Sequence, residues 1–265
     1  KCLGVDVWGK SDEVIQLIER ARSRGLRITA DQYPYRASGT HLDQALLPGW
    51  VYADDPDFEK KFSDPVLKDS IGADMVNNLR RRGGPGSLLL TSAAMPDVAG
   101  KTLAEISGEW QMPPIEAAKK IIVNGSAEVA SFNMQEEDIE NFMRQDWVMT
   151  SSDGTVGHPR KFGTFPKKIR EYVREKNILT LPEMVHKSTS LSAKVFGIPN
   201  RGLLKKGYYA DVLIFKPEEV LDKATYERPD VYAAGMEYVI VNGRVVIDKH
   251  HFTGMLAGQA IRRRK

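Results

Sequence analysis

Residues 11–35, SDEVIQLIERARSRGLRITADQYPY, decide the fold class of this chain. From Ser11 the apolar residues recur at helical spacing, acidic side chains occupy the first turn, and Gly25 ends the pattern. The following residues alternate apolar and polar side chains up to Ala30, and Pro34 then prevents further strand pairing. A helix, a tight glycine turn and a strand form the αβ unit of a parallel sheet or barrel. The stretch therefore predicts an α/β protein.

The regular pattern stops after this unit and returns later in the chain. Prolines punctuate short apolar pieces up to Pro114, and Arg80–Gly84 is predicted as loop, so this part is interpreted as a lid-like insertion. Helix and strand patterns then alternate again, and the strand ending at Thr150 runs into Ser151–Gly154. We predict further αβ units there, with a catalytic strand end.

The last part of the sequence has a different character. Ala210–Phe215 is predicted as a strand, and two more strands flank the Asn242-Gly243 turn, which is a strong signal for a tight hairpin. These strands predict a small antiparallel β module. The chain is thus divided into a barrel αβ unit, an insertion or lid-like subdomain, further barrel αβ units, and a β module with a tail, over residues 1–35, 36–114, 115–200 and 201–265.

Composition excludes several classes of protein. The 265 residues are 42% hydrophobic and 28% charged, and the net charge of +3 comes from interspersed acids and bases, so neither nucleic acid nor a membrane is expected as a partner. No apolar run approaches the roughly 20 residues of a membrane span, and no signal-peptide pattern is present. We expect a cytoplasmic protein. Cys2 is the only cysteine, and no paired-histidine spacing typical of zinc sites occurs.

Asp153 is the first candidate for chemistry. It follows an apolar strand and precedes Gly154, at the edge of an αβ barrel where catalytic groups gather. A carboxylate at that edge can bind a metal ion and accept a proton from metal-bound water. The Ser-Ser-Asp-Gly sequence also fits an Asx turn or a helix cap.

A second candidate group surrounds Arg160. Its guanidinium offers a fixed fork that holds a carboxylate by two parallel hydrogen bonds, which suits a substrate with a free acid group, although a surface loop arginine is the alternative interpretation. His158 lies two residues earlier. Tyr33 and Ser38, which follow the first strand, either line a pocket or pack beneath a loop.

These pieces together resemble the N-acyl-D-amino-acid deacylases, or D-aminoacylases, of the amidohydrolase superfamily. The resemblance runs nearly from end to end. It is carried by Asp31–Tyr35 with Leu46–Trp50, Ser152–Gly154 with His158–Pro166, Arg201–Leu203 with Gly207–Asp211, and Gly235–Gly243.

The resemblance implies the C-terminal half of such an enzyme: part of a metal-dependent (β/α)₈ TIM barrel with an inserted lid, plus a small antiparallel β-sandwich. It implies zinc-dependent hydrolysis of the amide bond of N-acyl-D-amino acids. Asp153 would be a metal ligand and the proton acceptor. Arg160 would bind the substrate α-carboxylate, with Tyr33, Ser38 and His158 also on the substrate side.

The family's other metal ligands precede the position that matches Lys1. We therefore expect Zn²⁺ only in the complete enzyme, and the isolated chain to be inactive, with its missing N-terminal half or a second copy as partner. Two alternatives remain open. One is a cyclic-amide hydrolase resembling dihydroorotase or hydantoinase, and the other is a non-catalytic assembly module.

Overall fold

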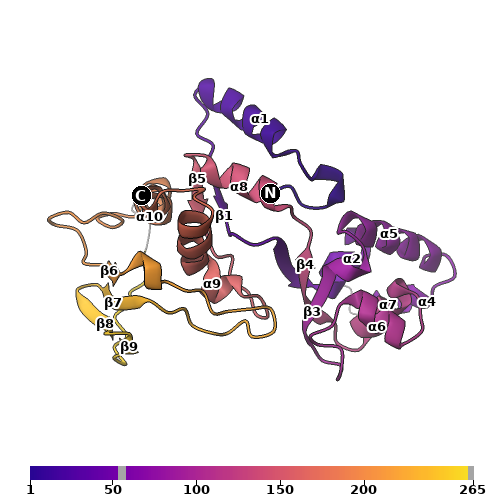
Figure 1. Cartoon of the computed structure of the whole chain (residues 1–265). Helices are drawn as coiled ribbons and strands as arrows, with labels where there is room; N and C mark the ends of the chain where they lie inside the picture. The colour runs from indigo at the N-terminus through magenta and orange to yellow at the C-terminus, as the bar shows by residue number, and fades with distance from the viewer. Residues whose placement is uncertain (53–57, 262–265) are drawn as a thin grey trace.

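The computed structural model describes residues 1–52 and 58–261. Within these ranges the strands form a parallel pair, an antiparallel sheet of three strands and an antiparallel sheet of four. Figure 1 shows the parallel pair near the centre, the three-stranded sheet with its helices on the right, and the four-stranded sheet at the lower left. None of the helices in these ranges has the length and apolar character needed to cross a bilayer. The predicted α/β class is confirmed.

The parallel pair consists of β1 (Ala30–Gln32) and β5 (Val148–Thr150). Each strand follows a helix, α1 (Ser11–Ser23) before β1 and α8 (Glu136–Arg144) before β5. The two helices are in contact, and apolar side chains from both pack around the buried Trp147. This arrangement brings the residues that follow β1 and β5 to the same sheet edge, because parallel strands end on the same side.

The strand predicted from Leu26 starts later than expected. Leu26 donates its backbone N–H to the carbonyl of Ala21, and the Arg22 guanidinium donates to the carbonyl of Ile28 at 2.6 Å. These bonds hold the residues after α1 against the end of the helix. Pairing with β5 therefore begins only at Ala30.

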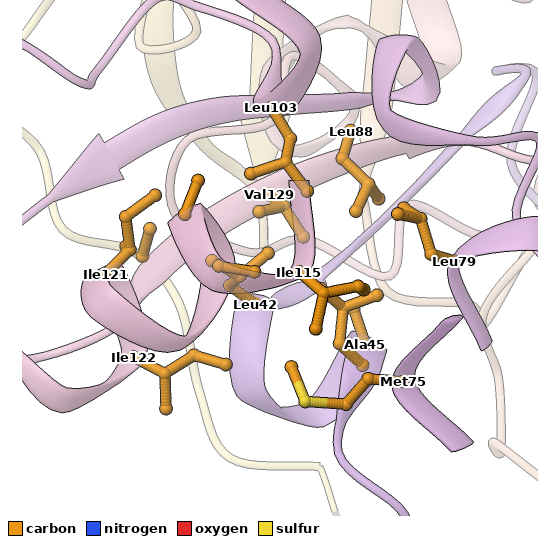
Figure 2. Packing of buried hydrophobic residues seen from close by; sticks show 14 of the residues in the cluster. Leu42, Ala45, Met75, Leu79, Leu88, Leu103, Ile115, Ile121, Ile122 and Val129 are labelled. Atoms are coloured by element: carbon orange, nitrogen blue, oxygen red, sulfur yellow. The ribbon is translucent and has the colours of Figure 1, made fainter. Parts of the chain in front are cut away.

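Residues 37–132 form a unit of helices around an antiparallel sheet, which contains most of the segment predicted as an insertion (residues 36–114) and is called the lid-like subdomain below, as a name only. Its antiparallel sheet has the order β2-β4-β3. The strands and helices are β2 (Ala37–His41), α2 (Leu42–Leu46), α3 (Gly49–Tyr52), α4 (Phe58–Ser63), α5 (Lys68–Arg81), β3 (Leu88–Ala93), α6 (Leu103–Glu109), α7 (Pro114–Val123) and β4 (Ala127–Phe132). Figure 2 shows side chains from the sheet and the helices pointing toward one another in one apolar cluster, including Leu42, Met75, Leu88, Leu103, Ile121 and Val129.

Two features of this subdomain differ from the sequence prediction. The residues Arg80 and Arg81, predicted as loop, form the last turn of α5. The helix is held by Ile71, Met75 and Leu79, which recur every four residues and are buried. In addition, β4 pairs antiparallel with β2 and β3 instead of extending the parallel sheet.

The chain is helical again after β5 and the loop of residues 151–159. It contains α9 (Arg160–Lys167), which continues into the π-helical segment η3 (Lys168–Glu175), and then α10 (Leu181–Ser188) and α11 (Ser190–Phe196). Helix α10 begins with a capping box, because Thr180 Oγ1 accepts from the Glu183 N–H while the Glu183 carboxylate accepts from the Thr180 N–H.

The C-terminal sheet has the order β6-β7-β8-β9. Its strands are β6 (Val212–Phe215), β7 (Met236–Val241), β8 (Arg244–Asp248) and β9 (His251–Phe252). The predicted hairpin is confirmed: Asn242 and Gly243 have φ values of 49° and 79°, as a tight type I′ turn requires. None of the strand residues in this sheet is buried in the described structure.

Candidate functional site

A cavity of about 600 Å³ lies where the parallel strands meet the lid-like subdomain. Its walls come from the residues that follow β1 and β5, from β2, from the start of α9 and from the end of α5. Four of the five predicted site residues line this cavity, namely Tyr33, Ser38, Asp153 and Arg160. The fold therefore gathers side chains that are more than a hundred residues apart in the sequence.

Asp153 and Arg160 form an ion pair in this cavity, with 3.2 Å between Asp153 Oδ2 and Arg160 Nη2. Their environments differ sharply. The Arg160 side chain is 3% exposed, whereas that of Asp153 is 59% exposed. Within the described structure, the buried Nε of Arg160 has no hydrogen-bond partner. The guanidinium thus keeps a donor free, and an unused buried donor is costly unless a ligand takes it up.

The backbone at Asp153 has a left-handed conformation, with φ at 45°. Such a conformation is uncommon for a residue with a side chain, and Asp and Asn adopt it more readily than most because their short polar groups bond locally. The Asp153 side chain lines the cavity and is largely exposed.

Tyr33 forms the floor beneath the cations. Its ring lies 4.5 Å from the guanidinium carbon of Arg160 and 3.7 Å from Nζ of Lys1, measured to the ring centroid. Both contacts are in the range of cation–π attraction. Burial raises the pKa of the Tyr33 phenol to about 12, so the ring remains neutral and supports two positive charges at neutral pH.

His158 lies behind Arg160 and is 1% exposed. Its Nε2 is 3.0 Å from the carbonyl oxygen of Ala37, and its Nδ1 accepts the backbone N–H of Arg160 at 3.1 Å. Burial lowers the His158 pKa to about 3, and the nearby guanidinium adds to this effect. The neutral ring with the proton on Nε2 fits both hydrogen bonds, so the geometry makes His158 a bridge from β2 to the start of α9.

Ser38 is linked to a residue that sequence reasoning missed. Asn133 is buried, and its side-chain Nδ2 donates to Ser38 Oγ at 3.0 Å. Its backbone carbonyl oxygen accepts from the Gly4 N–H and from Trp8 Nε1. The Oδ1 atom of Asn133 has no partner in the described structure. A single asparagine after a strand gives no signal in the sequence, because only the fold brings it to the cavity.

Comparison with known proteins supports the resemblance noted in the sequence. Residues 134–247 match the model of the amidohydrolase family. The N-acyl-D-glutamate deacylase of Alcaligenes xylosoxydans xylosoxydans is 33% identical over 93% of this chain, and the D-aminoacylase of the same organism is 30% identical over 99%. The chain is a relative of the N-acyl-D-amino-acid deacylases. It spans 44% and 47% of the lengths of these two proteins.

Solved structures of deacylases have the same fold as this chain. The crystal structure of a D-aminoacylase superposes with a TM-score of 0.77 at 30% identity, covering 98% of this chain and 48% of that one. An N-acyl-D-glutamate deacylase from Bordetella bronchiseptica, solved with zinc and a phosphonate inhibitor that mimics the tetrahedral intermediate, superposes with a TM-score of 0.73 at 29% identity. It covers 93% of this chain and 45% of its own.

The zinc seen in that deacylase prompts the question of which residues of this chain suit a metal. Among the described residues, no group of three or more His, Cys, Asp or Glu side chains lies together as potential ligands. Asp153 offers one carboxylate near the cavity mouth, whereas both ring nitrogens of His158 are engaged within the chain. The described residues therefore do not fit a complete zinc site by themselves.

Proposed function

We propose that this chain forms part of a zinc-dependent hydrolase that cleaves the amide bond of N-acyl-D-amino acids. The observation that carries the proposal is the buried Arg160 on the cavity wall, which pairs with Asp153 through Nη2 and has no hydrogen-bond partner for its Nε in the described structure. The similarity to deacylases over 93–99% of the chain supports it. The product pair would be a carboxylate from the acyl group and a free D-amino acid.

Arg160 binds the α-carboxylate of the substrate in this proposal. A planar guanidinium suits a carboxylate because two parallel N–H donors match its two oxygens. The ring of Tyr33 and the His158 bond to the backbone fix the orientation of the fork. Ser38 and Asn133 lie on the same cavity wall and offer hydroxyl and amide groups to the rest of the substrate.

Asp153 serves as the proton carrier. Its carboxylate is exposed to the cavity and is held 3.2 Å from Arg160, so a substrate anchored on Arg160 places its amide close to the carboxylate. The carboxylate accepts a proton from the attacking water and passes it to the nitrogen of the leaving amine. The same carboxylate would be one ligand of the metal, and the remaining ligands would come from outside these 265 residues.

The finer architecture belongs to the same proposal. We interpret β1 and β5 as neighbouring strands of a (β/α)₈ barrel, residues 37–132 as its inserted lid, and the four-stranded sheet as part of a β-sandwich. The remaining barrel strands would come from the missing N-terminal half, since the deacylase relatives are about twice as long.

The test is turnover of N-acetyl-D-amino acids by the full-length protein, with the cyclic ureides dihydroorotate and hydantoin as the alternative substrates. Asp153→Asn should lower kcat roughly 10²-fold to 10⁴-fold, because the amide cannot accept the proton. The fold should persist, since Asn tolerates the left-handed backbone of Asp153. Retention of more than about a tenth of kcat would assign the proton transfer to another group.

Arg160→Lys is the companion variant. A point charge replaces the fork, so KM should rise far more than kcat falls. Equal loss for substrates that lack the α-carboxylate would contradict the role of Arg160. Turnover of the ureides but not of N-acetyl-D-amino acids would replace the proposal with the cyclic-amide alternative.

A further inference from the structure

A buried lysine lies between the two elements that carry the main site residues. Lys168 is the first residue of η3, which continues the helix that begins at Arg160, and its side chain is fully buried. Its Nζ donates to Thr150 Oγ1 at 2.9 Å. Thr150 is the last residue of β5, three positions before Asp153. One hydrogen bond therefore joins the helix of Arg160 to the strand of Asp153.

The hydroxyl of Thr150 is also linked to a third element, helix α10. Its Oγ1 lies 2.9 Å from Ser188 Oγ, which lies 2.8 Å from the carbonyl oxygen of Met184. Each hydroxyl has one proton to donate, so a single direction satisfies the whole chain: Lys168 to Thr150, Thr150 to Ser188, and Ser188 to Met184. The helix α10 packs against both β5 and η3. The three elements thus meet at the Thr150 hydroxyl.

An amine at this buried position lowers stability unless its hydrogen bond offsets the cost. Burial lowers the pKa of Lys168 to about 7, and the nearby Lys187 lowers it further, so its charged neighbour is another cation. An apolar side chain of similar length would fill the same space without the cost of burying an amine. Packing alone therefore does not explain a lysine here, whereas the bond to Thr150 does.

Two neighbouring lysines have different partners. Lys187 donates to the backbone carbonyl oxygens of Gln145 and Val148, which lie before β5 and at its first residue. Lys167 precedes Lys168 in the same helix and pairs with Glu171. Of these three lysines, Lys168 is the one whose amine is bonded to the end of β5.

We propose that Lys168 is a positioning residue of the amide-cleaving site, which acts through Thr150 to fix Asp153 relative to Arg160. The inference rests on the function proposed above, in which Arg160 anchors the substrate and Asp153 transfers the proton. Lys168 lies behind the cavity wall and touches neither the substrate nor the reacting atoms. A shift of about 1 Å between an anchored substrate and a catalytic group can cost about 10²-fold in rate, even when its cause lies far from the chemistry.

The first test measures kcat and KM of the full-length protein for N-acetyl-D-alanine. Lys168→Met removes the donor and keeps a long side chain. It should lower kcat roughly 10-fold to 100-fold while KM changes little, because Arg160 still binds the α-carboxylate. Thr150→Val removes the acceptor and should have the same effect. The double variant should be no slower than either single variant, since both changes break one bond.

Two further variants distinguish positioning from a general loss of structure. Thr150→Ser keeps the hydroxyl and should retain kcat. Lys167→Met is the matched control, because it makes the same substitution one residue earlier in the same helix and removes an ion pair with Glu171 instead. It should leave kcat unchanged. An unchanged kcat in both Lys168→Met and Thr150→Val, additive losses in the double variant, or an equal loss in Lys167→Met would overturn the inference.

Amide hydrogen exchange separates this inference from the proposed function, because it does not depend on turnover. Residues 151–160 should exchange faster in Lys168→Met and Thr150→Val than in the unchanged protein, with no change in Lys167→Met. If N-acetyl-D-alanine and the other N-acetyl-D-amino acids are not hydrolysed, the proposed function fails, yet this local effect still supports the positioning of Asp153, and its absence refutes it. If they are hydrolysed and neither kcat nor exchange responds to Lys168→Met, the proposed function stands and the positioning role is refuted.

Discussion

The lid-like subdomain and the C-terminal sheet are both antiparallel, but they differ in how their apolar side chains are covered. In the lid, Leu88 and Leu90 of β3 are fully buried beneath helices. In the C-terminal sheet, Leu213 and Ile214 of β6 are 56% and 46% exposed. The first region closes its core with its own elements, whereas the second leaves large apolar side chains exposed.

This difference predicts which substitutions should change stability and which should change substrate recognition. The apolar cluster of the lid supplies local stability, while the cavity lies at the seam between the lid and the parallel strands. Residues at the seam are held by hydrogen bonds and ion pairs, as Arg160 and Asn133 illustrate. Substitutions in the core should therefore change the free energy of unfolding, and substitutions at the seam should change substrate recognition.

The strongest test of this comparison is Leu90→Ala in the lid against Leu213→Ala in the C-terminal sheet. Removing the fully buried Leu90 leaves a cavity and should lower the free energy of unfolding by about 2–5 kcal/mol. The exposed Leu213 should contribute no more than about 0.5 kcal/mol. Urea unfolding measures both. Equal losses at the two positions would mean that the C-terminal sheet is covered in solution.

A second prediction concerns the loss of stability at low pH that the buried His158 should cause. Because the buried ring has a pKa of about 3 while an unfolded histidine titrates near 6.5, the unfolded state binds one more proton between these values. Stability should therefore fall as the pH is lowered through that window, by about 1.4 kcal/mol per pH unit from this group. The cations Arg160 and Lys1 and the rings of Tyr35 and Tyr226 face the imidazole.

His158→Gln tests whether this imidazole causes the loss of stability in acid. Glutamine can donate to the Ala37 carbonyl and accept the Arg160 N–H, but it does not titrate. The pH dependence of unfolding should flatten between pH 6.5 and 3 in this variant. An unchanged acid slope would show that other groups are responsible.

The capping boxes of α6 and α10 offer a test with a smaller expected effect on stability. One lies in the lid-like subdomain and the other beside the parallel strands. Thr102 caps α6 in the lid and Thr180 caps α10 beside the parallel strands, with the same reciprocal bonds. Each Thr→Ala change should cost about 1 kcal/mol. Thermal unfolding of the two variants would show whether both halves belong to one cooperative unit. Two separate transitions, each shifted by only one variant, would divide the molecule into independent units.

The smallest expected effect is on association. The apolar surface of the C-terminal sheet should cause the 265-residue chain to associate, and Ile214→Lys should raise the monomer fraction with little change in stability. Light scattering of both forms measures this. A dilute, stable monomer of the unchanged chain would contradict the prediction.

Local signals in the sequence determined much of the secondary structure. The apolar spacing of α1, α7 and α8, the capping box before α10 and the Asn242-Gly243 hairpin all depend on residues that are near one another in the chain. The motif that contains Asp153 and Arg160 is equally local, which is why its resemblance to the deacylases was visible without a structure.

Long-range pairing was decided only by the tertiary structure. Strand β2, with the sequence Ala-Ser-Gly-Thr-His, lacks the apolar alternation of a strand and exists because it pairs with β4, about ninety residues away. That pairing places Ala37 beside the ring of His158 and Ser38 beside Asn133. The end of α5 reaches the cavity through its packing against α2. A sequence pattern records the preference of a segment for helix or strand, whereas the partner of each segment depends on the packing of the whole chain.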